Sequence, residues 1–203
     1  MPPKLLLASA NRGKLRELRA ILEGLPVELV GLDDAGAGEP PEVEETGDTF
    51  LENALLKARA YADWSGLAAV ADDSGLEVDA LGGAPGVRSA RYAGQGASDR
   101  ANLDKLLDGL DGVPPERRTA RFRCAAVLVD PEVGKWHAEA AWDGRILDTP
   151  RGSGGFGYDP VFLPDGWDQT SAEVDQATKD AASHRGRAFR ALRPAIEAWA
   201  GRT

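Results

Sequence analysis

The chain has 203 residues, of which 42% are hydrophobic and 28% charged, so it can bury a core and is not a disordered tail. Its formal net charge of -9 argues against polynucleotides and anionic membranes as partners, because phosphate backbones are bound by clustered Lys and Arg. A phosphate-bearing ligand would therefore need local cations or a metal ion.

The single cysteine, Cys124, cannot form an internal disulfide, and no Cys/His cluster has the spacing of a zinc site. No segment approaches the roughly 20 apolar residues that a membrane span needs. We expect a cytoplasmic protein, folded as a single domain over residues 1–203, with Cys124 buried in a strand.

The first half of the chain alternates strand and helix signals. Residues 4–8 predict a strand, and three leucines at helical spacing after "SANRGK" predict a helix. "VELVGL" predicts a second strand, and residues 33–48 an exposed loop. Thr49 opens a capping box, "TFLE", that starts a helix ending at Gly66.

The apolar residues 67–71 predict a buried strand with "DDSG" at its carboxyl end, where open α/β sheets bind ligands. Neighbouring residues of an extended chain point to opposite faces. Asp72 and Asp73 therefore cannot easily serve the same site if the strand continues through them.

The second half predicts more strand pairing. "LEVDAL" reads as continued strand, Ser98 as the cap of a leucine-rich helix, and residues 119–129 and 135–142 as a hairpin. A helix follows Ser183. Crossover and hairpin strands together predict an α/β fold with a mixed, partly elongated sheet.

The stretch "ASANRGK" joins a strand to a helix, so its backbone N–H groups and Lys14 could bind an anion. It is not a P-loop, because that motif needs Gly at Ala8 and Ser or Thr at Leu15. The alternative is an ordinary turn with a solvated lysine.

The stretch "GSGGFG" matches the letters of a dinucleotide fingerprint, yet extended residues follow it instead of a helix. We therefore reject that interpretation. A loop that allows close backbone approach is the functional alternative, with Phe156 stacking on a base and Asp159 accepting hydrogen bonds. A plain hairpin connection is the other.

Two further motifs carry charge. Glu45 lies in the acidic run "EVEETG", and its carboxylate, like those of "DDSG", suits Mg2+ better than zinc, although such runs are often only solvated loops. "KDAASHR" gathers Lys179, His184 and Arg185, which could pair with phosphate or donate to a base. His137 has no motif around it and is expected to be an ordinary surface or core residue. The basic run "ERRTARFR" is expected to form a solvated or interface face.

Taken together, "ASANRGKLRELRAIL", "EETGDTFLENALLKARA", "ADDSGLEVDALGGAPGVRSARYAG" and "GFGYDPVF" followed by "SHR" resemble the inosine/xanthosine triphosphate pyrophosphatase family over nearly the whole chain. The resemblance implies an elongated mixed β-sheet flanked by helices, with two lobes around a central cleft, and a homodimer. It also implies Mg2+-dependent hydrolysis of noncanonical purine nucleoside triphosphates (ITP, dITP, XTP) to the monophosphate and pyrophosphate.

The resemblance also implies roles for individual residues. The phosphates would be held by Ser9, Ala10, Asn11, Arg12, Gly13 and Lys14. Many relatives carry Gly or a hydroxyl residue at the position of Ala10, and alanine can contribute only its backbone N–H there. Glu45 and Asp73 would bind the metal. Asp73 would also be the catalytic carboxylate that acts on the attacking water, with Lys14 as the catalytic cation and Ser74 nearby on the substrate. The nucleoside end would be formed by Phe156, Gly157, Tyr158 and Asp159, with Lys179 on the phosphate chain and His184 and Arg185 on the purine.

Two other functions stay open from the sequence. A related pyrophosphatase could act on other modified nucleoside triphosphates, and a nucleotide sensor could bind without turnover. A phosphatase of the haloacid dehalogenase type is disfavoured, because the first strand ends in "ASAN" and offers no aspartate nucleophile.

Overall fold

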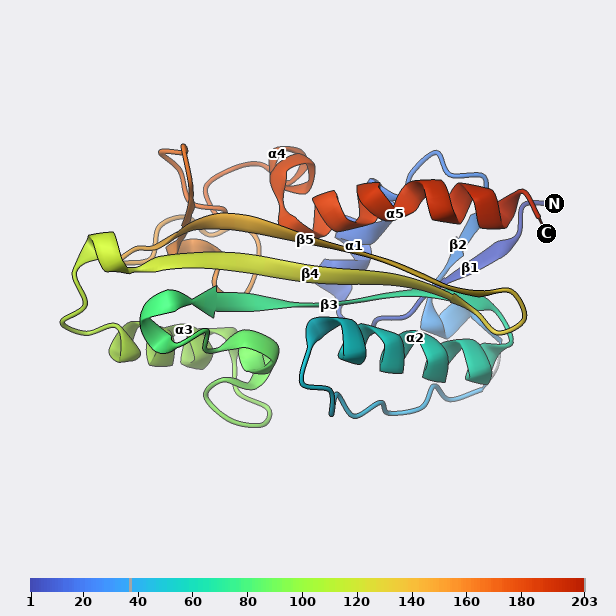
Figure 1. Ribbon diagram of the computed structural model, residues 1–203, viewed down its shortest axis with the longest axis horizontal. Helices are drawn as coiled ribbons and strands as arrows, with labels where there is room; N and C mark the ends of the chain where they lie inside the picture. Colours follow the sequence, from blue (N-terminus) through green and yellow to red (C-terminus); the bar gives the residue numbers. More distant parts are fainter. Residues whose placement is uncertain (37, 203) are drawn as a thin grey trace. The chain divides into compact units, whose positions relative to one another are not determined.

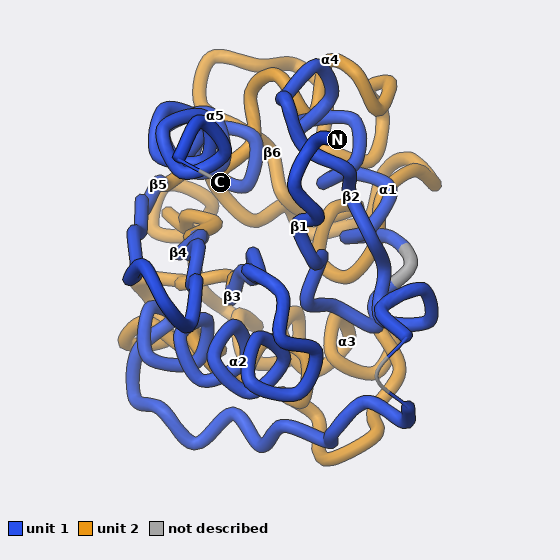
Figure 2. Tube along the Cα trace, turned by 90° about the vertical axis from the view of Figure 1, so that its right-hand side faces the viewer, with its two compact units in different colours: residues 1–73, 124–140, 185–203 blue, residues 74–123, 141–184 orange. Residues whose placement is uncertain are grey.

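The structure is a computed structural model that describes residues 1–36 and 38–202. The chain forms two compact units (Figure 2). Unit 1 comprises residues 1–73, 124–140 and 185–203, and unit 2 comprises residues 74–123 and 141–184. Each unit contains some of the residues that the sequence singles out.

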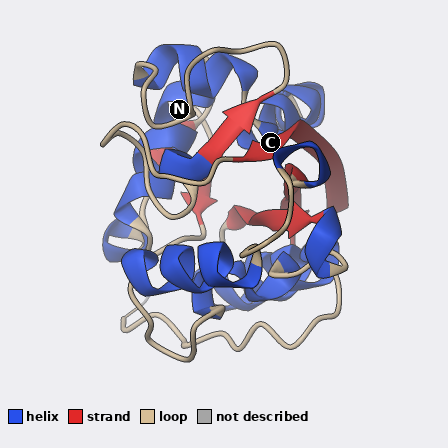
Figure 3. Cartoon of the chain, turned by 90° about the vertical axis from the view of Figure 1, so that its left-hand side faces the viewer, coloured by secondary structure: helices blue, strands red, loops and turns tan. Residues whose placement is uncertain are grey.

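The strands are β1 (Lys4–Leu7), β2 (Glu28–Val30), β3 (Ala68–Val78), β4 (Thr119–Asp130), β5 (Gly134–Ile146) and β6 (Phe162–Pro164). Their order in the sheet is β2-β1-β3-β4-β5-β6. Figure 1 labels β1 to β5. β1 pairs in parallel with β2 and β3, whereas β5 and β6 are antiparallel. The sheet is therefore mixed, and with its helices (Figure 3) it confirms the predicted α/β fold class.

β3 corrects one expectation. The motif "DDSG" does not follow a strand that ends at Ala71; it lies inside β3, which runs without a break to Val78. Nearly every residue of this strand is buried, as in a strand that is covered on both faces. The strand ends before Asp79, which opens a 3-10 helix, Asp79–Leu81, where continued strand was expected.

Unit 1 contains α1 (Arg12–Ile21) and α2 (Phe50–Ser65), and α5 (His184–Ala200) lies in it from Arg185 onward. Figure 1 shows α5 and α2 on opposite sides of the sheet. Leucines of β1 and α1 form one hydrophobic core with the apolar face of α5, including Phe189 and Ile196. Burial of such side chains contributes roughly 1.5–3 kcal/mol each, so this core holds α1 and α5 against the strands.

The predicted boundaries of α2 are confirmed. The Thr49 hydroxyl accepts from the N–H of Glu52, and the Glu52 carboxylate accepts from the N–H of Thr49. This reciprocal capping satisfies two otherwise unpaired N–H groups. At the other end Gly66 adopts φ 68°, which a glycine tolerates without strain.

Unit 2 contains α3 (Asp99–Gly109), capped by Ser98 as expected, and α4 (Gln176–Ala182), a helix that was not predicted. Shorter 3-10 helices occupy Gly86–Arg91, Pro115–Arg117 and Asp159–Val161, and Leu32–Asp34 forms one in unit 1. Leu103 and Leu106 of α3 pack with Phe122, Trp142 and Phe162 of the strands to form the core of this unit.

The hairpin predicted for residues 119–129 and 135–142 is confirmed by β4 and β5, which are sheet neighbours joined by three residues. β5 continues to Ile146, further than expected. Cys124 is buried in β4 and His137 is exposed on β5. No helix in the described ranges is long and apolar enough to cross a membrane.

Candidate active site

The two adjacent aspartates of β3 point to opposite faces of the strand, as its extended geometry requires. Asp72 lies 3.2 Å from the Nζ of Lys14 and 3.2 Å from the Nε of Arg185. Asp73 accepts from the side-chain amide of Asn53 at 3.1 Å. The nearest partners of the two carboxylates therefore differ, and the expectation that they do not serve the same site stays a prediction.

On the Asp73 face, a lysine of α2 joins two carboxylates. The Nζ of Lys57 lies 2.5 Å from Oε1 of Glu45 and 3.5 Å from Oδ1 of Asp73. Glu45 comes from the long loop before α2, and Asp73 from β3. Two segments far apart in sequence thus turn their carboxylates toward one cationic centre.

Burial and charge set the protonation of this cluster. Burial raises the pKa of Asp73, and although Lys57, Lys14 and the Asn53 amide lower it, Glu45 adds to the increase. For Lys57, burial by itself lowers the pKa, but the charges of Asp73, Asp72 and Glu45 outweigh it and raise the pKa. Lys57 therefore stays charged at neutral pH, and Asp73 is a stronger base than an exposed aspartate.

Glu45 and Asp73 are also the residues that could hold a metal ion. Within the described part of the chain, no three His, Cys, Asp or Glu side chains gather closely enough to form a metal site by themselves. Two carboxylates that converge on one cation fit Mg2+, which is bound through one or two carboxylates together with waters and substrate oxygens.

On the Asp72 face, a buried ion network connects α1, β3 and α5. Arg185 donates to Asp72 and to Glu17, and all three residues are buried. Burial lowers the pKa of Arg185, but the charges of Asp72 and Glu17 outweigh it and raise the pKa. The guanidinium is thus fixed by two carboxylates, and the expected role of Arg185 in reading a purine stays a prediction.

The strand-to-helix turn of "ASANRGK" is organised by Asn11. Its side chain accepts from the N–H groups of Gly13 at 2.9 Å and Lys14 at 3.1 Å, and its own N–H donates to the Ser9 hydroxyl. Two of the N–H groups expected to bind an anion are therefore already capped. Ala10 is exposed, and the side chain of Arg12 lies outside the part of the chain that the structure describes.

Unit 2 contains a second cluster, centred on Asp159. This buried carboxylate accepts from the N–H of Phe156 at 2.8 Å, from the Ser171 hydroxyl at 2.9 Å and from the Nζ of Lys179 at 2.7 Å. The same ammonium lies 4.9 Å from the centre of the Phe156 ring. Lys179, expected on the phosphate chain, thus lies with the residues expected at the nucleoside.

The glycine loop lies close to other parts of the chain, and its expected close approach to a ligand stays a prediction. A Cβ on Gly152 would lie 2.6 Å from the backbone of Ala172, and one on Gly155 would lie 2.0 Å from a carboxylate oxygen of Asp159. Both glycines also have positive φ, 81° and 69°. The loop needs glycine in order to fold back onto these groups.

The rest of the loop is tied to neighbouring segments of unit 2. Gly157 donates its N–H to the carboxylate of Asp99 at 2.9 Å, and the Tyr158 hydroxyl donates to the carbonyl of Ser89 at 2.8 Å. Burial raises the pKa of Tyr158, which keeps the hydroxyl protonated as this bond requires. Ser74, expected near the substrate, is half-buried in β3.

His184 stacks on an aromatic ring that the sequence did not single out. Its imidazole lies 4.8 Å from the ring of Phe122, with an interplanar angle of 11°. Phe122 in turn meets Phe162 edge to face at 4.6 Å. His184 is buried, so its ring orientation is set by this packing.

The basic run corrects another expectation. Arg118 is buried, and its guanidinium donates to the carbonyls of Leu110 and Val113, which end the α3 segment. Arg121 pairs with Asp79 at 2.8 Å. The run therefore serves partly to close helix-end carbonyls, and is not simply a solvated face.

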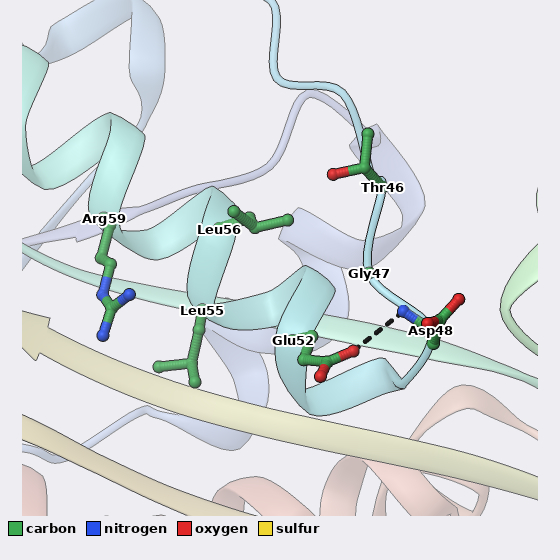
Figure 4. A pocket seen from close by; sticks show the side chains of 7 residues that line it. All are labelled: Thr46, Gly47, Asp48, Glu52, Leu55, Leu56 and Arg59. Atoms are coloured by element: carbon green, nitrogen blue, oxygen red, sulfur yellow. Dashed lines mark hydrogen bonds between the residues drawn. The ribbon is translucent and has the colours of Figure 1, made fainter.

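A pocket of about 390 Å³ lies on unit 1 between α2 and the loop that precedes it (Figure 4). It is lined by Thr46, Gly47, Asp48, Glu52, Leu55, Leu56 and Arg59. Figure 4 shows the Asp48 N–H bound to Glu52 at its rim, at 2.8 Å. None of the predicted site residues lines this pocket, so it is distinct from both polar clusters.

Comparison with known proteins gives consistent results. Residues 5–195 match the family model described as the Ham1 family. The chain is 52% identical over 198 residues to the dITP/XTP pyrophosphatase of Geobacter sulfurreducens, covering 98% of each chain. It is 56% identical over 196 residues to that of Frankia alni, covering 93% of this chain and 95% of the other.

Solved structures agree. A HAM1 protein from Coxiella burnetii has a TM-score of 0.86 and 40% identity, covering 96% of this chain and 98% of that one. The Staphylococcus aureus Ham1 protein has a TM-score of 0.84 and 38% identity, covering 97% and 99%. The similarity therefore extends over nearly the whole chain.

Proposed function

The chain belongs to the Ham1 family, and from this premise we propose that it hydrolyses noncanonical purine nucleoside triphosphates such as ITP, dITP and XTP to the monophosphate and pyrophosphate. Such an enzyme removes these nucleotides from the nucleotide pool. The observation that carries the proposal is the convergence of Glu45 and Asp73 on Lys57, in a chain whose relatives are named dITP/XTP pyrophosphatases.

Glu45 and Asp73 would hold Mg2+. Such an ion, when bound, supplies positive charge to the phosphate oxygens and thereby lowers the cost of developing negative charge. Lys57 offsets one of the two carboxylate charges, so a bound Mg2+ would leave the cluster with a net positive charge for an anionic substrate. This local positive charge would attract an anionic substrate to a protein whose net charge is -9.

Asp73 acts on the attacking water. Its carboxylate accepts the proton that the water loses as it attacks phosphorus, and a pKa raised by burial makes this transfer more favourable at neutral pH. Lys14 and the backbone of Ser9 to Gly13 bind the phosphates, with Ser74 and Lys179 as further phosphate contacts.

Residues of the glycine loop and of the start of α5 bind the nucleoside. Phe156 offers an aromatic face to the base, and Gly157, Tyr158 and Asp159 shape the surrounding loop. His184 and Arg185 donate hydrogen bonds to the 6-oxo group of the purine. Adenine presents a 6-amino group, itself a donor, in place of this acceptor, so adenine nucleotides are disfavoured.

The test is a nucleotide panel with the purified protein and Mg2+. We expect dITP and XTP to be hydrolysed with a kcat/KM roughly 100-fold or more above that for dATP, because a buried donor without an acceptor is costly. Equal turnover of dITP and dATP would contradict the base assignment. Preference for a modified pyrimidine would favour the related-pyrophosphatase alternative, and tight binding without turnover would favour a nucleotide sensor.

We further propose that the protein is a cytoplasmic homodimer. The family resemblance implies the dimer, and a sole cysteine that is buried suits a reducing compartment. Light scattering should then give twice the 21.5 kDa mass of one chain, and the mass of one chain would contradict the dimer.

A further inference from the structure

One buried side chain forms hydrogen bonds both to the loop that carries Glu45 and to the carboxylate of Asp73. Asn53 of α2 is 0% exposed, and its amide spans the gap between the Glu45 loop and β3. Its Oδ1 accepts from the N–H of Gly47 at 2.7 Å, and its Nδ2 donates to Oδ2 of Asp73 at 3.1 Å.

The orientation of this amide is determined by its neighbours. The N–H of Gly47 can only donate, so the atom that faces it must be the amide oxygen. The NH2 group then points at Asp73, whose ionised oxygen can only accept. A side chain with an acceptor at one end and a donor at the other is needed, which Asn supplies and Asp, Leu or Ala does not.

The contact with the loop is very close. A Cβ on Gly47 would lie 2.8 Å from Oδ1 of Asn53 and 2.6 Å from the Cβ of Glu52. Residue 47 must therefore be glycine for the loop to reach Asn53. Glu45 is two residues before this contact, so the position of its carboxylate depends on it.

The other end of the bridge orients Asp73. Asn53 bonds to Oδ2, while Oδ1 faces Lys57, which in turn contacts Glu45. Asn53 and Lys57 are four residues apart on α2, so they project from the same side of the helix. One helix thus supplies both the group that orients Asp73 and the cation between the two carboxylates.

We propose that Asn53 is a positioning residue, which holds the Glu45 loop and the Asp73 carboxylate in the mutual geometry that metal binding and water activation require. This inference rests on the proposed function, since it assigns Asn53 a task in that reaction. Polar groups that orient metal ligands typically contribute 10- to 100-fold to metal affinity or activity.

The test uses Asn53→Asp, which keeps the size of the side chain and an acceptor for Gly47 but removes the donor to Asp73. We expect kcat for dITP to fall roughly 10- to 100-fold and the Mg2+ concentration for half-maximal activity to rise by a similar factor. We also expect a smaller increase in melting temperature on adding Mg2+, which reports metal binding without turnover.

Asn102 provides the matched control. It is also a buried Asn on a helix, and its amide accepts from the N–H of Ala93 at 2.7 Å and donates to the carbonyl of Ala90 at 3.2 Å. Asn102→Asp should lower the melting temperature, as loss of a buried hydrogen bond does, but leave the Mg2+ response unchanged. Gly47→Ala should reproduce the effect of Asn53→Asp from the other side of the contact.

The outcomes separate the two proposals. An Asn53→Asp protein with wild-type kcat and wild-type Mg2+ dependence would overturn the positioning role, and so would equal metal effects in Asn53→Asp and Asn102→Asp. If the wild-type protein hydrolyses neither dITP nor XTP, the proposed function fails. The shift in melting temperature with Mg2+ then still decides whether Asn53 positions the metal-binding carboxylates.

Discussion

The buried environment of Asp73 disfavours the charged form of its carboxyl group. Because burial raises the pKa of this carboxyl in the folded protein, ionisation is less favourable there than in the unfolded chain. Stability is therefore greatest below the unfolded pKa of about 3.9, falls as the pH rises toward the folded pKa, and stays lower above it. At neutral pH the charged Asp73 destabilises the fold, as is common for groups kept for function.

The variant Asp73→Asn tests both the catalytic role of Asp73 and the destabilising effect of its charge. We expect turnover of dITP to fall at least about 100-fold, since no group remains to accept the proton of the attacking water. Nucleotide binding should persist, and the melting temperature at pH 7 in metal-free buffer should be no lower than that of the wild type. Near-normal turnover would remove Asp73 from its assigned role.

Asp79→Asn is the control with the opposite sign. Its bond with Thr119 lowers the pKa of Asp79, and those with Arg121 add to this, so the charged form stabilises the fold above the unfolded pKa. This variant should melt at a lower temperature than wild type at pH 7 and retain turnover. A lower melting temperature for Asp73→Asn as well would contradict the assigned cost.

Asn53, Lys57 and Glu17 show which residues sequence reasoning misses. Each lies on a helix whose apolar spacing predicts the helix but does not tell which polar side chains face inward. Asn53 and Lys57 are four residues apart beside the buried alanines of α2, and that spacing was the available signal. The carboxylates that Asn53 and Lys57 contact, Glu45 and Asp73, could be predicted because they lie in acidic runs, and carboxylates suit a metal ion such as Mg2+.

At the scale of elements, the glycine loop is held by a buried ion pair. Asp159 and Lys179 are each 3% exposed, and their 2.7 Å contact links the loop to α4. Removing one member of such a pair typically costs 3–5 kcal/mol, because the other charge stays buried. The loop geometry therefore depends on the space that Gly155 leaves for the Asp159 carboxylate.

Gly155→Ala and Gly157→Ala form a matched pair. Both positions have positive φ, 69° and 60°, so each alanine should cost about 1 kcal/mol from backbone strain. At Gly157 a Cβ meets nothing within 4 Å, whereas at Gly155 it collides with Asp159. We expect denaturant unfolding to show a loss of about 3 kcal/mol or more for Gly155→Ala alone. Equal losses would contradict the role of the buried pair.

The strand β3 shows how far local patterns reach. The apolar residues 67–71 correctly predicted a buried strand, but the polar motif "DDSG" was expected to lie at the end of this strand. The strand continues because Asp72 and Asp73 find charged partners on both faces, which are supplied by α1, α2 and α5. Those partners come from distant parts of the sequence, so local propensity could not reveal them.

For the whole molecule, the composition and the order of motifs predicted the α/β class, the mixed sheet and the family. The family resemblance implied two lobes but not where the chain divides: the boundaries of the two units at residues 73/74, 123/124 and 140/141 fall inside β3, β4 and β5. No glycine- or proline-rich linker marks these points, because continuous strands cross them. The net charge of -9 likewise gave no hint of the local Lys14, Lys57 and Arg185 cations.

The identity of the products distinguishes a pyrophosphatase from a phosphatase. With dITP, Mg2+ and the wild-type protein, and with Asp73→Asn as the control for contaminating phosphatases, the products would be separated by ion-exchange chromatography. Hydrolysis between the α- and β-phosphates predicts equal amounts of dIMP and pyrophosphate, and neither product should form in the control. Formation of dIDP and orthophosphate, or equal product in both proteins, would contradict the account.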